Sequence, residues 1–395
     1  MLSSKARAIS PSPTLAIDAK FKQMKANGED VVGFGCGEPD FDTPQHIKDA
    51  AIRALNNGAT KYTPAAGMIE LREAVSEKFK NENGLEYKFS DIVISNGAKH
   101  SLMNAFMAVL NPGDEVIIPA PFWVSYPELV KLADGVPVII NTSEENSFKA
   151  TAADFTRALT PKTKAIILNS PSNPTGMVYT EDELREIADF AVKNDLYVIS
   201  DEIYEHLIYE GSHVSIASFN EEIKKRTIVI NGVSKTYAMT GWRIGYAAAS
   251  AEIAKIMANV QSHAASNPNS IAQAATIAAL RGGYSEVDRM KRHFKKRRDY
   301  MVEAINAIDG VSCKMPQGAF YIMMNIEDLI GKTYYGKIIS NSDDFAEIFL
   351  EKAKVAVVPG SGFGADKYVR WSYATSMDNI VEGVQRLKNF LENRY

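Results

Sequence analysis

Short apolar segments alternate with helical patterns along the first two thirds of the sequence, and this alternation limits the possible folds more than any other feature. The apolar segments are rich in β-branched residues, and most are apolar throughout rather than alternately apolar and polar. Strands of this kind belong in a sheet that is covered on both faces. The repeated order of strand, helix and strand therefore predicts an α/β domain with a mainly parallel sheet, from about residue 45 to 285. We predict seven strands, at Ile92–Ser95, Glu115–Ile118, Val136–Asn141, Lys164–Asn169, Leu196–Ser200, Thr227–Asn231 and Arg243–Ala249.

Two of the intervening helices have recognisable ends. The first is predicted from an apolar stripe at helical spacing, which comprises Leu102, Ala105, Phe106, Val109 and Leu110. The sequence Asn-Pro-Gly-Asp at residues 111–114 then ends this helix. Thr180 opens the second helix, because the three acidic residues that follow it complement the positive end of the helix dipole.

The sequence changes character after Gly282 and Gly283. A long charged helical stretch precedes three strand-like segments, Ala319–Asn325, Val355–Val358 and Tyr368–Tyr373. This pattern predicts a smaller α+β domain. Because 395 residues exceed what one hydrophobic core usually organises, we expect two domains. We place the large domain at residues 46–285 and the small domain at residues 286–395, with residues 1–45 joining the small domain.

The charge balance gives no sign of a nucleic-acid or membrane partner. The chain has 44 Lys and Arg residues against 48 Asp and Glu residues, a net charge of −4. One basic run, KRHFKKRR at Lys291–Arg298, stands out. Read as a nucleic-acid patch it would need interleaved aromatic residues and a wider basic surface. We interpret it instead as a solvated helix face with Phe294 pointing inward.

Cysteine content and the amino terminus bear on the cell compartment. Two cysteines, Cys36 and Cys313, cannot build a disulfide framework or a cysteine-rich metal site, so a reducing compartment is the simplest interpretation. No apolar stretch approaches the ~18 residues of a membrane span. The sequence MLSSKARAIS could begin a transit peptide, but Pro11 and Pro13 interrupt it early. We therefore expect a cytoplasmic protein.

Lys235 is the first candidate for chemistry. It follows a predicted strand and is preceded by Ser234, and Arg243 lies a few residues further on. Open α/β sheets bind their ligands at the carboxyl edge, where such residues would lie. Arginine suits a phosphate, and a partly desolvated lysine can act as an amine nucleophile toward an aldehyde. The alternative is a surface turn with Lys and Arg, and spacing alone does not exclude it.

Asp201 and Tyr204 form a second candidate pair, directly after the strand that ends at Ser200. A carboxylate at the carboxyl end of a strand could hold a protonated ring nitrogen, and a tyrosine three residues later could reach the opposite edge of the same ring. The alternative is an ordinary helix start with acidic residues in its first turn.

Two further segments follow strands. In Ser95–Lys99, small residues let backbone N–H groups approach an anion at a helix amino terminus. In Asn169–Gly176, Asn173 precedes a proline, which restricts its backbone and could fix its amide toward a ligand. Taken singly, this second segment is only a proline-rich turn.

The glycine-rich stretch Gly33–Gly37 does not match the dinucleotide-binding pattern, because Glu38, Pro39 and Asp40 follow and no helix opens at once. We expect this segment to bring its backbone close to something small, with Gly37 as the contact.

Five separated motifs, taken together, resemble the class I aminotransferases, which are pyridoxal-phosphate enzymes of fold type I. The resemblance covers essentially the whole chain, and within the family it is most similar to the bacterial-type (subgroup Iβ) aspartate aminotransferases, through Gly37–Pro44, Trp123–Glu128 and Met239–Tyr246. The five motifs are Ser234-Lys235 with Arg243, Asp201 with Tyr204, Asn173-Pro174, Gly37-Glu38-Pro39-Asp40 and Tyr368-Val369-Arg370-Trp371-Ser372.

The resemblance implies catalytic roles for this chain. Lys235 would bind the aldehyde of pyridoxal 5′-phosphate covalently and then carry a proton between the substrate Cα and the cofactor. Asp201 would keep the pyridine nitrogen protonated, so that the ring accepts electrons. Tyr204 and Asn173 would form hydrogen bonds with the phenolic oxygen of the cofactor.

The resemblance also implies cofactor contacts. Trp123 would stack on the ring, its alternative role being that of a core or interface aromatic residue. Tyr62 would reach the phosphate of the neighbouring subunit, so that a homodimer shares its active sites. The phosphate would lie against Gly97, Ala98, Lys99, Ser234 and Arg243.

For the substrate, Arg370 would bind the α-carboxylate with two hydrogen bonds, assisted by Asn173, Trp123 and the Gly37 backbone. Its alternative is a salt bridge between domains. Lys99 could pair with a distal carboxylate, which favours aspartate and glutamate, or be a solvated lysine at a helix start. The implied reaction transfers the amino group of L-aspartate to 2-oxoglutarate, giving oxaloacetate and L-glutamate in two half-reactions.

The amino terminus departs from the pattern of the subgroup. The common sequence Lys-Pro-Ser-Ala-Thr is Ser-Pro-Ser-Pro-Thr here, at residues 10–14. The lysine is missing and a second proline stiffens a segment that can cover the substrate, which puts prephenate and other bulky acids in doubt. Aromatic, alanine and prephenate aminotransferases are the main alternatives, and a β-lyase is a distant one. A DNA-binding regulator of the same fold would need an added module for which the chain leaves no room.

Overall fold

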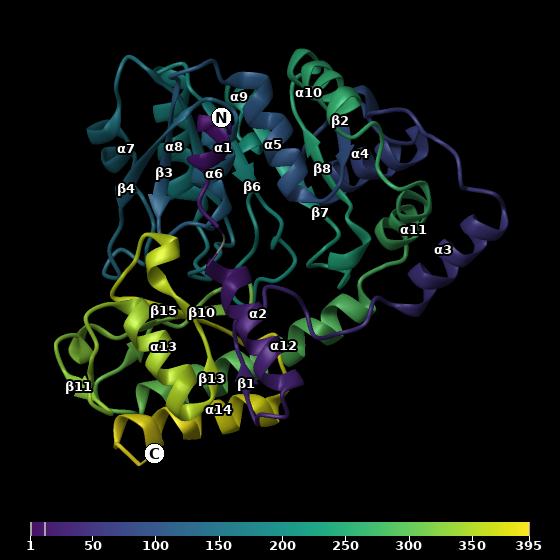
Figure 1. Ribbon diagram of the computed structural model, residues 1–395. Helices are drawn as coiled ribbons and strands as arrows, with labels where there is room; N and C mark the ends of the chain where they lie inside the picture. Colours follow the sequence, from purple (N-terminus) through teal and green to yellow (C-terminus); the bar gives the residue numbers. More distant parts are fainter. Residues whose placement is uncertain (1, 12, 395) are drawn as a thin grey trace.

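Seven strands of the computed structural model form one sheet, in the spatial order β2-β8-β7-β6-β5-β3-β4 (Figure 1). The structure describes residues 2–11 and 13–394. Every strand except β8 runs in the same direction, because β8 pairs in antiparallel fashion with both β2 and β7. The prediction of an α/β fold with a mainly parallel sheet of seven strands is therefore confirmed. The strands are β2 (Ile92–Ser95), β3 (Glu115–Ala120), β4 (Val136–Asn141), β5 (Thr163–Asn169), β6 (Tyr197–Asp201), β7 (Thr227–Gly232) and β8 (Gly245–Ala248).

Helices cover both faces of this sheet, which explains why its inner strands are apolar throughout. Neighbouring residues of β3 show the alternation, since Ile118 packs in one helix layer and Ile117 in the other. Helices α5 (Ala98–Val109), α6 (Ser125–Leu132) and α10 (Ala251–Ala264) lie on the first face. The second face packs against α3 (Gln45–Asn56), α4 (Ile69–Asn83), α7 (Ala152–Ala158), α8 (Glu181–Lys193), α9 (Glu221–Arg226) and α11 (Ser270–Arg281).

The two helix ends predicted from sequence are confirmed. Helix α5 ends at Val109, just before the predicted stop. Thr180 is the N-cap of α8, where its side chain accepts a hydrogen bond from the backbone of Glu183 and the Glu183 carboxylate accepts one in return.

A smaller, antiparallel sheet has the order β14-β15-β10-β9 and lies below the large sheet in Figure 1. The short strand β1 (Val32–Gly33) pairs with β13 (Val355–Ala356), so the beginning of the chain packs with its end. The division into domains at residues 45 and 285 stays a prediction. The remaining strands are β9 (Ser312–Cys313), β10 (Tyr321–Asn325), β11 (Thr333–Tyr334), β12 (Lys337–Ile338), β14 (Val358–Pro359) and β15 (Tyr368–Ser372), and the remaining helices are α1 (Ser4–Arg7), α2 (Pro13–Ala26), α12 (Ser285–Asn306), α13 (Ser342–Ala353) and α14 (Met377–Leu391).

Two predicted strands begin later than expected and a third is divided, each for a local reason. The prediction for Arg243–Ala249 is wrong at its start, because Arg243 has φ +57° and follows a turn of 3₁₀-helix. Ala319 has φ +56°, so β10 begins two residues later. The predicted strand Val355–Val358 is divided, because β13 pairs with β1 and β14 pairs with β15.

The basic run on α12 is only partly a solvated face. Phe294 is fully buried, as predicted. Arg298 is buried as well and pairs with Asp299, and Arg297 binds Asp40 with two hydrogen bonds of 2.7 and 2.8 Å. Arg298 also donates to the backbone oxygen of Pro316 at 2.8 Å, so both arginines hold loops in place, which the sequence interpretation missed.

The first helices connect the two sheets. Lys5 pairs with Asp134, and the backbone of Ser10 donates to Glu128 on α6, whereas α2 packs beside β13 and β14 (Figure 1). The first residues of the chain are thus in contact both with a helix of the large sheet and with strands near the end of the chain. In the described part of the chain, no helix has the length and apolar character needed to cross a membrane.

Candidate active site

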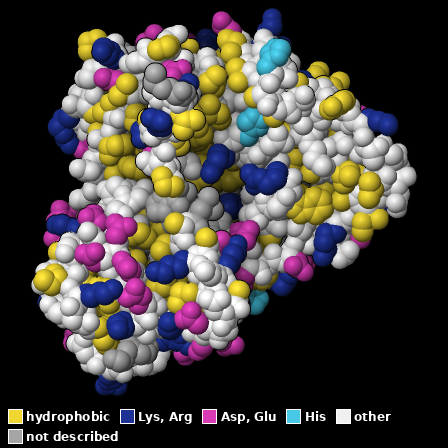
Figure 2. Space-filling view, viewed as in Figure 1, with side chains coloured by type: hydrophobic (Ala, Val, Ile, Leu, Met, Phe, Trp, Pro, Cys, Tyr) yellow, Lys and Arg dark blue, Asp and Glu magenta, His cyan; other side chains and the backbone are white. Residues whose placement is uncertain are grey.

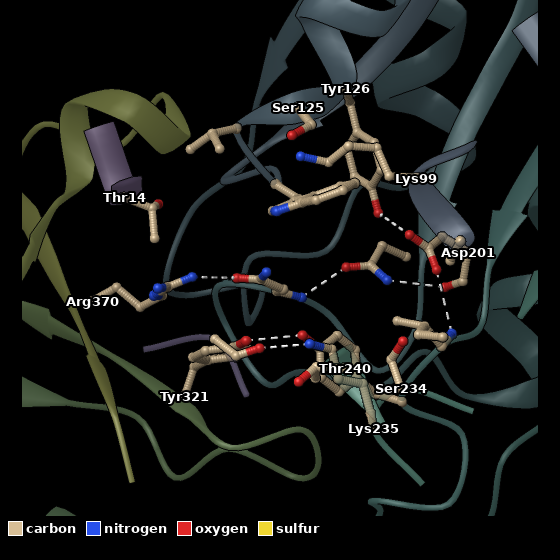
Figure 3. A pocket seen from close by; sticks show the side chains of 18 of the residues that line it. Thr14, Lys99, Ser125, Tyr126, Asp201, Ser234, Lys235, Thr240, Tyr321 and Arg370 are labelled. Carbon is tan, nitrogen blue, oxygen red and sulfur yellow. Dashed lines mark hydrogen bonds between the residues drawn. The ribbon is translucent and has the colours of Figure 1, made fainter. Parts of the chain in front are cut away.

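The carboxyl ends of β2, β3, β5, β6 and β7 meet at one edge of the large sheet, and a cavity of about 240 Å³ lies between this edge and the small sheet. Figure 2 shows a hollow in this face of the molecule, with Lys and Arg side chains at its edge. All of the predicted site residues except Gly97 and Tyr62 line the cavity: Gly37, Ala98, Lys99, Trp123, Asn173, Asp201, Tyr204, Ser234, Lys235, Arg243 and Arg370 (Figure 3).

Lys235 projects into the cavity just beyond the end of β7. Its Nζ donates a hydrogen bond of 2.5 Å to the backbone oxygen of Gly37. Burial, reinforced by the charges of Arg243 and Arg370, lowers the pKa of Lys235 to about 8. A sizeable fraction of this amine is therefore neutral near pH 7–8, as a nucleophile or a base requires.

Asp201 lies at the end of β6 and is 4% exposed. Burial raises its pKa to about 6, although two hydrogen bonds oppose this shift. The Tyr126 hydroxyl donates to Oδ2 at 2.7 Å, and the backbone N–H of Ile203 donates to Oδ1 at 3.3 Å. A carboxylate in such surroundings gains by binding a cation, and a protonated ring nitrogen would be one.

Tyr204 is buried beside Asp201, and its hydroxyl lies 2.9 Å from the hydroxyl of Tyr321. Tyr321 comes from β10 of the small sheet, so this hydrogen bond joins the two sheets across the cavity. Burial holds the pKa of Tyr204 well above its ordinary value, which keeps the hydroxyl protonated.

A cradle for an anion is built around the amino terminus of α5. Gly97 precedes this helix with φ +83°, and Arg243 packs against it so closely that a Cβ at Gly97 would lie 2.1 Å from Nη2. A Cβ at Gly245 would lie 2.2 Å from the backbone nitrogen of Ala98. Glycine is therefore required at both places. Free N–H groups at the helix start, the Arg243 guanidinium and the Ser234 hydroxyl fit a phosphate.

Trp123 forms one wall of the cavity. Its ring packs edge-on against Tyr126 at 5.4 Å, and the Lys99 ammonium lies 4.9 Å from the ring centre. Burial, and after it the charge of Arg243, lowers the pKa of Lys99. An anion near Lys99 would favour the charged ammonium and so oppose both effects.

Arg370 is a buried cation that has no anionic partner within the described part of the chain. It is 1% exposed, and its Nη1 and Nη2 donate to Oδ1 of Asn173 at 3.0 Å and to the Gly35 oxygen at 2.9 Å. Nε is buried without a hydrogen-bond acceptor among the described residues. Because a buried charge is costly when unpaired, this arginine is suited to a carboxylate that arrives in the cavity.

The two remaining predicted residues lie outside the cavity lining. Gly97 immediately precedes Ala98 in the chain and lies against the Arg243 side chain. Tyr62 belongs to the loop between α3 and α4 and is 91% exposed. Within a single chain it therefore takes no part in the cavity.

Sequence reasoning missed several lining residues. Tyr126 and Tyr321 were not singled out, and neither was Thr240, whose hydroxyl donates to Glu38 at 2.6 Å while its backbone oxygen accepts from Arg243. Thr14, which also lines the cavity, was noted only as part of the amino-terminal segment. Ser12 of that segment lies outside the described residues.

Together these groups suit a flat aromatic cofactor that carries a phosphate and an aldehyde. The cradle would hold the phosphate, Asp201 would face a ring nitrogen, and Lys235 would face the aldehyde. Arg370 remains for the carboxylate of a substrate, on the side of the cavity away from Asp201 (Figure 3).

Comparisons with known proteins agree with this chemistry. The family model described as aminotransferase class I and II matches residues 29–387. An aspartate aminotransferase from Bacillus sp. (strain YM-2) is 50% identical over 393 residues, which cover 99% of each chain. An aspartate/prephenate aminotransferase from Nitrosomonas europaea is 48% identical, again with 99% of each chain covered. The crystal structure of the Rhizobium meliloti aspartate aminotransferase superposes with a TM-score of 0.96 at 44% identity, covering 100% of this chain and 99% of the other.

Proposed function

The chain belongs to the aminotransferase class I and II family, and on this basis we propose that it transfers the amino group of L-aspartate to 2-oxoglutarate with pyridoxal 5′-phosphate as its cofactor. Oxaloacetate and L-glutamate are the products. Within the family, we assign it to the bacterial-type subgroup Iβ.

The buried, unpaired guanidinium of Arg370 carries the proposal. It faces the same cavity as the Lys235 amine, which places a carboxylate-binding group and a nucleophile around one substrate. The planar fork of arginine matches a carboxylate with two hydrogen bonds. An α-amino acid is the simplest molecule that presents a carboxylate to Arg370 and its own amine toward the centre of the cavity.

The residues around the cavity offer a partner for each polar group of the cofactor. When bound, pyridoxal phosphate supplies an aldehyde that condenses with amines and a ring that accepts electrons from the substrate Cα. Asp201 would hold the proton on the ring nitrogen, and Tyr204 with Asn173 would donate to the ring oxygen. Trp123 would pack against the ring, and the cradle at Ala98 would bind the phosphate.

Lys235 moves the proton that the reaction requires. As a neutral amine, Lys235 would take the proton from the substrate Cα onto Nζ and hold it there until it is returned. The lowered pKa supports this role, because the amine is then a base near neutral pH. Lys235 lines the cavity and its Nζ donates to the Gly37 oxygen, so the amine faces the space that a substrate would occupy.

Lys99 supports a preference for dicarboxylic substrates. Its ammonium lies over Trp123. Of the four basic side chains that line the cavity, Arg243 and Lys235 are assigned to the cofactor, which leaves Lys99 and Arg370 for the carboxylates of a substrate. A second carboxylate in aspartate or glutamate would pair with Lys99 once the α-carboxylate occupies Arg370. A neutral side chain would leave Lys99 without this partner.

The proposal includes a homodimer in the cytoplasm. Tyr62 is almost fully exposed, so its hydroxyl is free to reach the phosphate of a neighbouring subunit. Both cysteines are free, as expected in a reducing compartment.

A panel of amino acids tests this function. The enzyme loaded with cofactor is mixed with L-aspartate, L-alanine or L-phenylalanine, and the change in visible absorbance is followed in a stopped-flow instrument. We expect a fast half-reaction with aspartate alone. A faster reaction with alanine or phenylalanine would instead assign the protein to a different substrate class of the same family.

A further inference from the structure

Tyr321 occupies a central position that the proposed function leaves unexplained. It is 1% exposed on β10 and lines the cavity. Its hydroxyl lies 2.9 Å from the hydroxyl of Tyr204, and its ring centre lies 4.4 Å from the Arg370 guanidinium carbon. A Cβ at Gly37 would lie 3.2 Å from the same hydroxyl. The side chain of Tyr321 thus lies against Arg370, Tyr204 and the backbone at Gly37.

The direction of the bond between the two hydroxyls follows from proton counting. Burial raises the pKa of Tyr204 and that of Tyr321, the latter to about 12, so each hydroxyl keeps its single proton at neutral pH. A phenol has one donor. If Tyr204 donates to the cofactor ring oxygen, it can only accept from Tyr321.

We propose that Tyr321 is a positioning residue that donates a hydrogen bond to the Tyr204 hydroxyl and thereby strengthens the hydrogen bond from Tyr204 to the cofactor ring oxygen. This inference rests on the proposed function, because it takes Tyr204 as the donor to that oxygen. Consecutive hydrogen bonds polarise one another, so a hydroxyl that accepts a hydrogen bond is itself a stronger hydrogen-bond donor.

The ring of Tyr321 has a second role, the contact with Arg370, which can be tested separately from the role of its hydroxyl. A guanidinium at 4.4 Å over an aromatic face is attracted by the ring electrons, so the ring holds Arg370 in place before a substrate binds. Tyr321→Phe removes the hydroxyl and keeps the ring, whereas Tyr321→Leu removes both. The two variants therefore distinguish the effect on Tyr204 from the effect on Arg370.

Absorbance as a function of pH, in the enzyme loaded with cofactor and without substrate, tests the hydroxyl. A strong hydrogen-bond donor at the ring oxygen would stabilise negative charge on that oxygen. The pKa of the proton that the oxygen shares with the Lys235 nitrogen would therefore be lower. Loss of the Tyr321 hydroxyl weakens this donor and keeps the proton in place to higher pH. We expect Tyr321→Phe to raise the pH midpoint of the visible absorbance change by about half a unit.

Two further variants show whether the shift passes through Tyr204. Tyr204→Phe should raise the midpoint by more than Tyr321→Phe, and adding Tyr321→Phe to it should cause no additional change. Tyr373→Phe is the matched control, because Tyr373 is also fully buried in the small domain, its hydroxyl donates to the Ala319 backbone oxygen, and it does not line the cavity. This control should leave the midpoint unchanged.

Kinetics test the ring. Tyr321→Phe should lower kcat with little change in KM for aspartate, whereas Tyr321→Leu should also raise KM several-fold, by about the strength of one cation–π contact. An unchanged or lowered midpoint in Tyr321→Phe, or an equal shift in the presence and absence of Tyr204, would overturn the proposal. A wild-type protein that shows no visible absorbance with the cofactor would instead refute the proposed function.

Discussion

Nη1 of Arg370 donates a hydrogen bond of 3.0 Å to Oδ1 of Asn173, and this contact begins a chain of bonds that crosses the floor of the cavity. The backbone of Asn173 donates to Oδ1 of Asn169, and Nδ2 of Asn169 donates to the backbone oxygen of Asp201. The group suited to a substrate carboxylate is thereby held at a fixed separation from the group suited to the cofactor ring. The cavity is preorganised for both ligands.

Arg370 should be sensitive even to a change that keeps its charge. Arg370→Lys loses the planar fork and the bond to Asn173, so kcat/KM for aspartate should fall by about 100-fold or more. Steady-state kinetics would measure this loss. Arg386→Lys, on α14 and far from the cavity, serves as the control and should leave kcat/KM within about twofold. Equal effects of the two changes would show that Arg370 has no special role.

Asp201 should make the cofactor-free protein less stable at neutral pH. Its folded pKa of about 6 lies above the ordinary value of 3.8, so the folded state favours the protonated form. The loss of folding free energy caused by ionising buried Asp201 is absent below pH ~4 and grows between pH ~4 and ~6. Above pH ~6 this loss is fully present. Asp201→Asn should therefore raise the free energy of unfolding by about 1–3 kcal/mol at pH 7 and by nothing near pH 4.

Urea unfolding of the cofactor-free protein at a series of pH values would measure this difference. The same variant should lose most of its aminotransferase activity when cofactor is added, since the ring nitrogen loses its anionic partner. A constant difference in stability between pH 4 and 7 would contradict the assigned ionisation.

Lys99→Ala should discriminate between substrates. Loss of the ammonium should lower kcat/KM for aspartate and glutamate by about 10-fold and leave neutral amino acids nearly unchanged. Lys193→Ala, an exposed lysine in the last turn of α8, is the control. If dicarboxylic and neutral substrates suffered equally, Lys99 would have no part in recognising the distal carboxylate.

Mixed dimers test the sharing of active sites. Subunits with Tyr62→Ala and subunits with Lys235→Ala should each form dimers of low activity. In a mixed dimer, one site combines the native Lys235 of the first subunit with the native Tyr62 of the second. Equal mixing after dissociation should therefore restore about one quarter of the wild-type activity. Activity that stays at the level of the two parent dimers would argue against a shared site.

The sequence predicted the framework better than the contacts. Apolar runs such as Ile92–Ser95 are long enough and regular enough to mark strands. Because the strands are parallel, the residues that follow their carboxyl ends, among them Asp201 and Lys235, lie at one edge of the sheet for any conformation of the loops. Arg243 was assigned to a strand although it has φ +57°, because a left-handed residue other than glycine leaves no local signal.

Contacts between distant residues were harder to predict. The bond between Tyr126 and Asp201 joins residues 75 positions apart, and that between Tyr204 and Tyr321 spans 117 positions. Both depend on how helix and sheet layers pack, which periodicity does not encode. Tyr126 lies within the segment Trp123–Glu128 and Tyr321 within the predicted strand Ala319–Asn325, and neither position indicates a partner in the sequence.

The absorbance spectrum of the purified protein with pyridoxal 5′-phosphate, before and after L-aspartate, tests the central claim most directly. We predict that the wild type keeps a visible band after removal of free cofactor and that aspartate shifts this band. Lys235→Ala should retain the circular dichroism of the folded chain but lose the band of the wild type and at least ~100-fold of the rate. A folded wild type that binds no cofactor, or a Lys235→Ala enzyme that transaminates at full rate, would contradict the account.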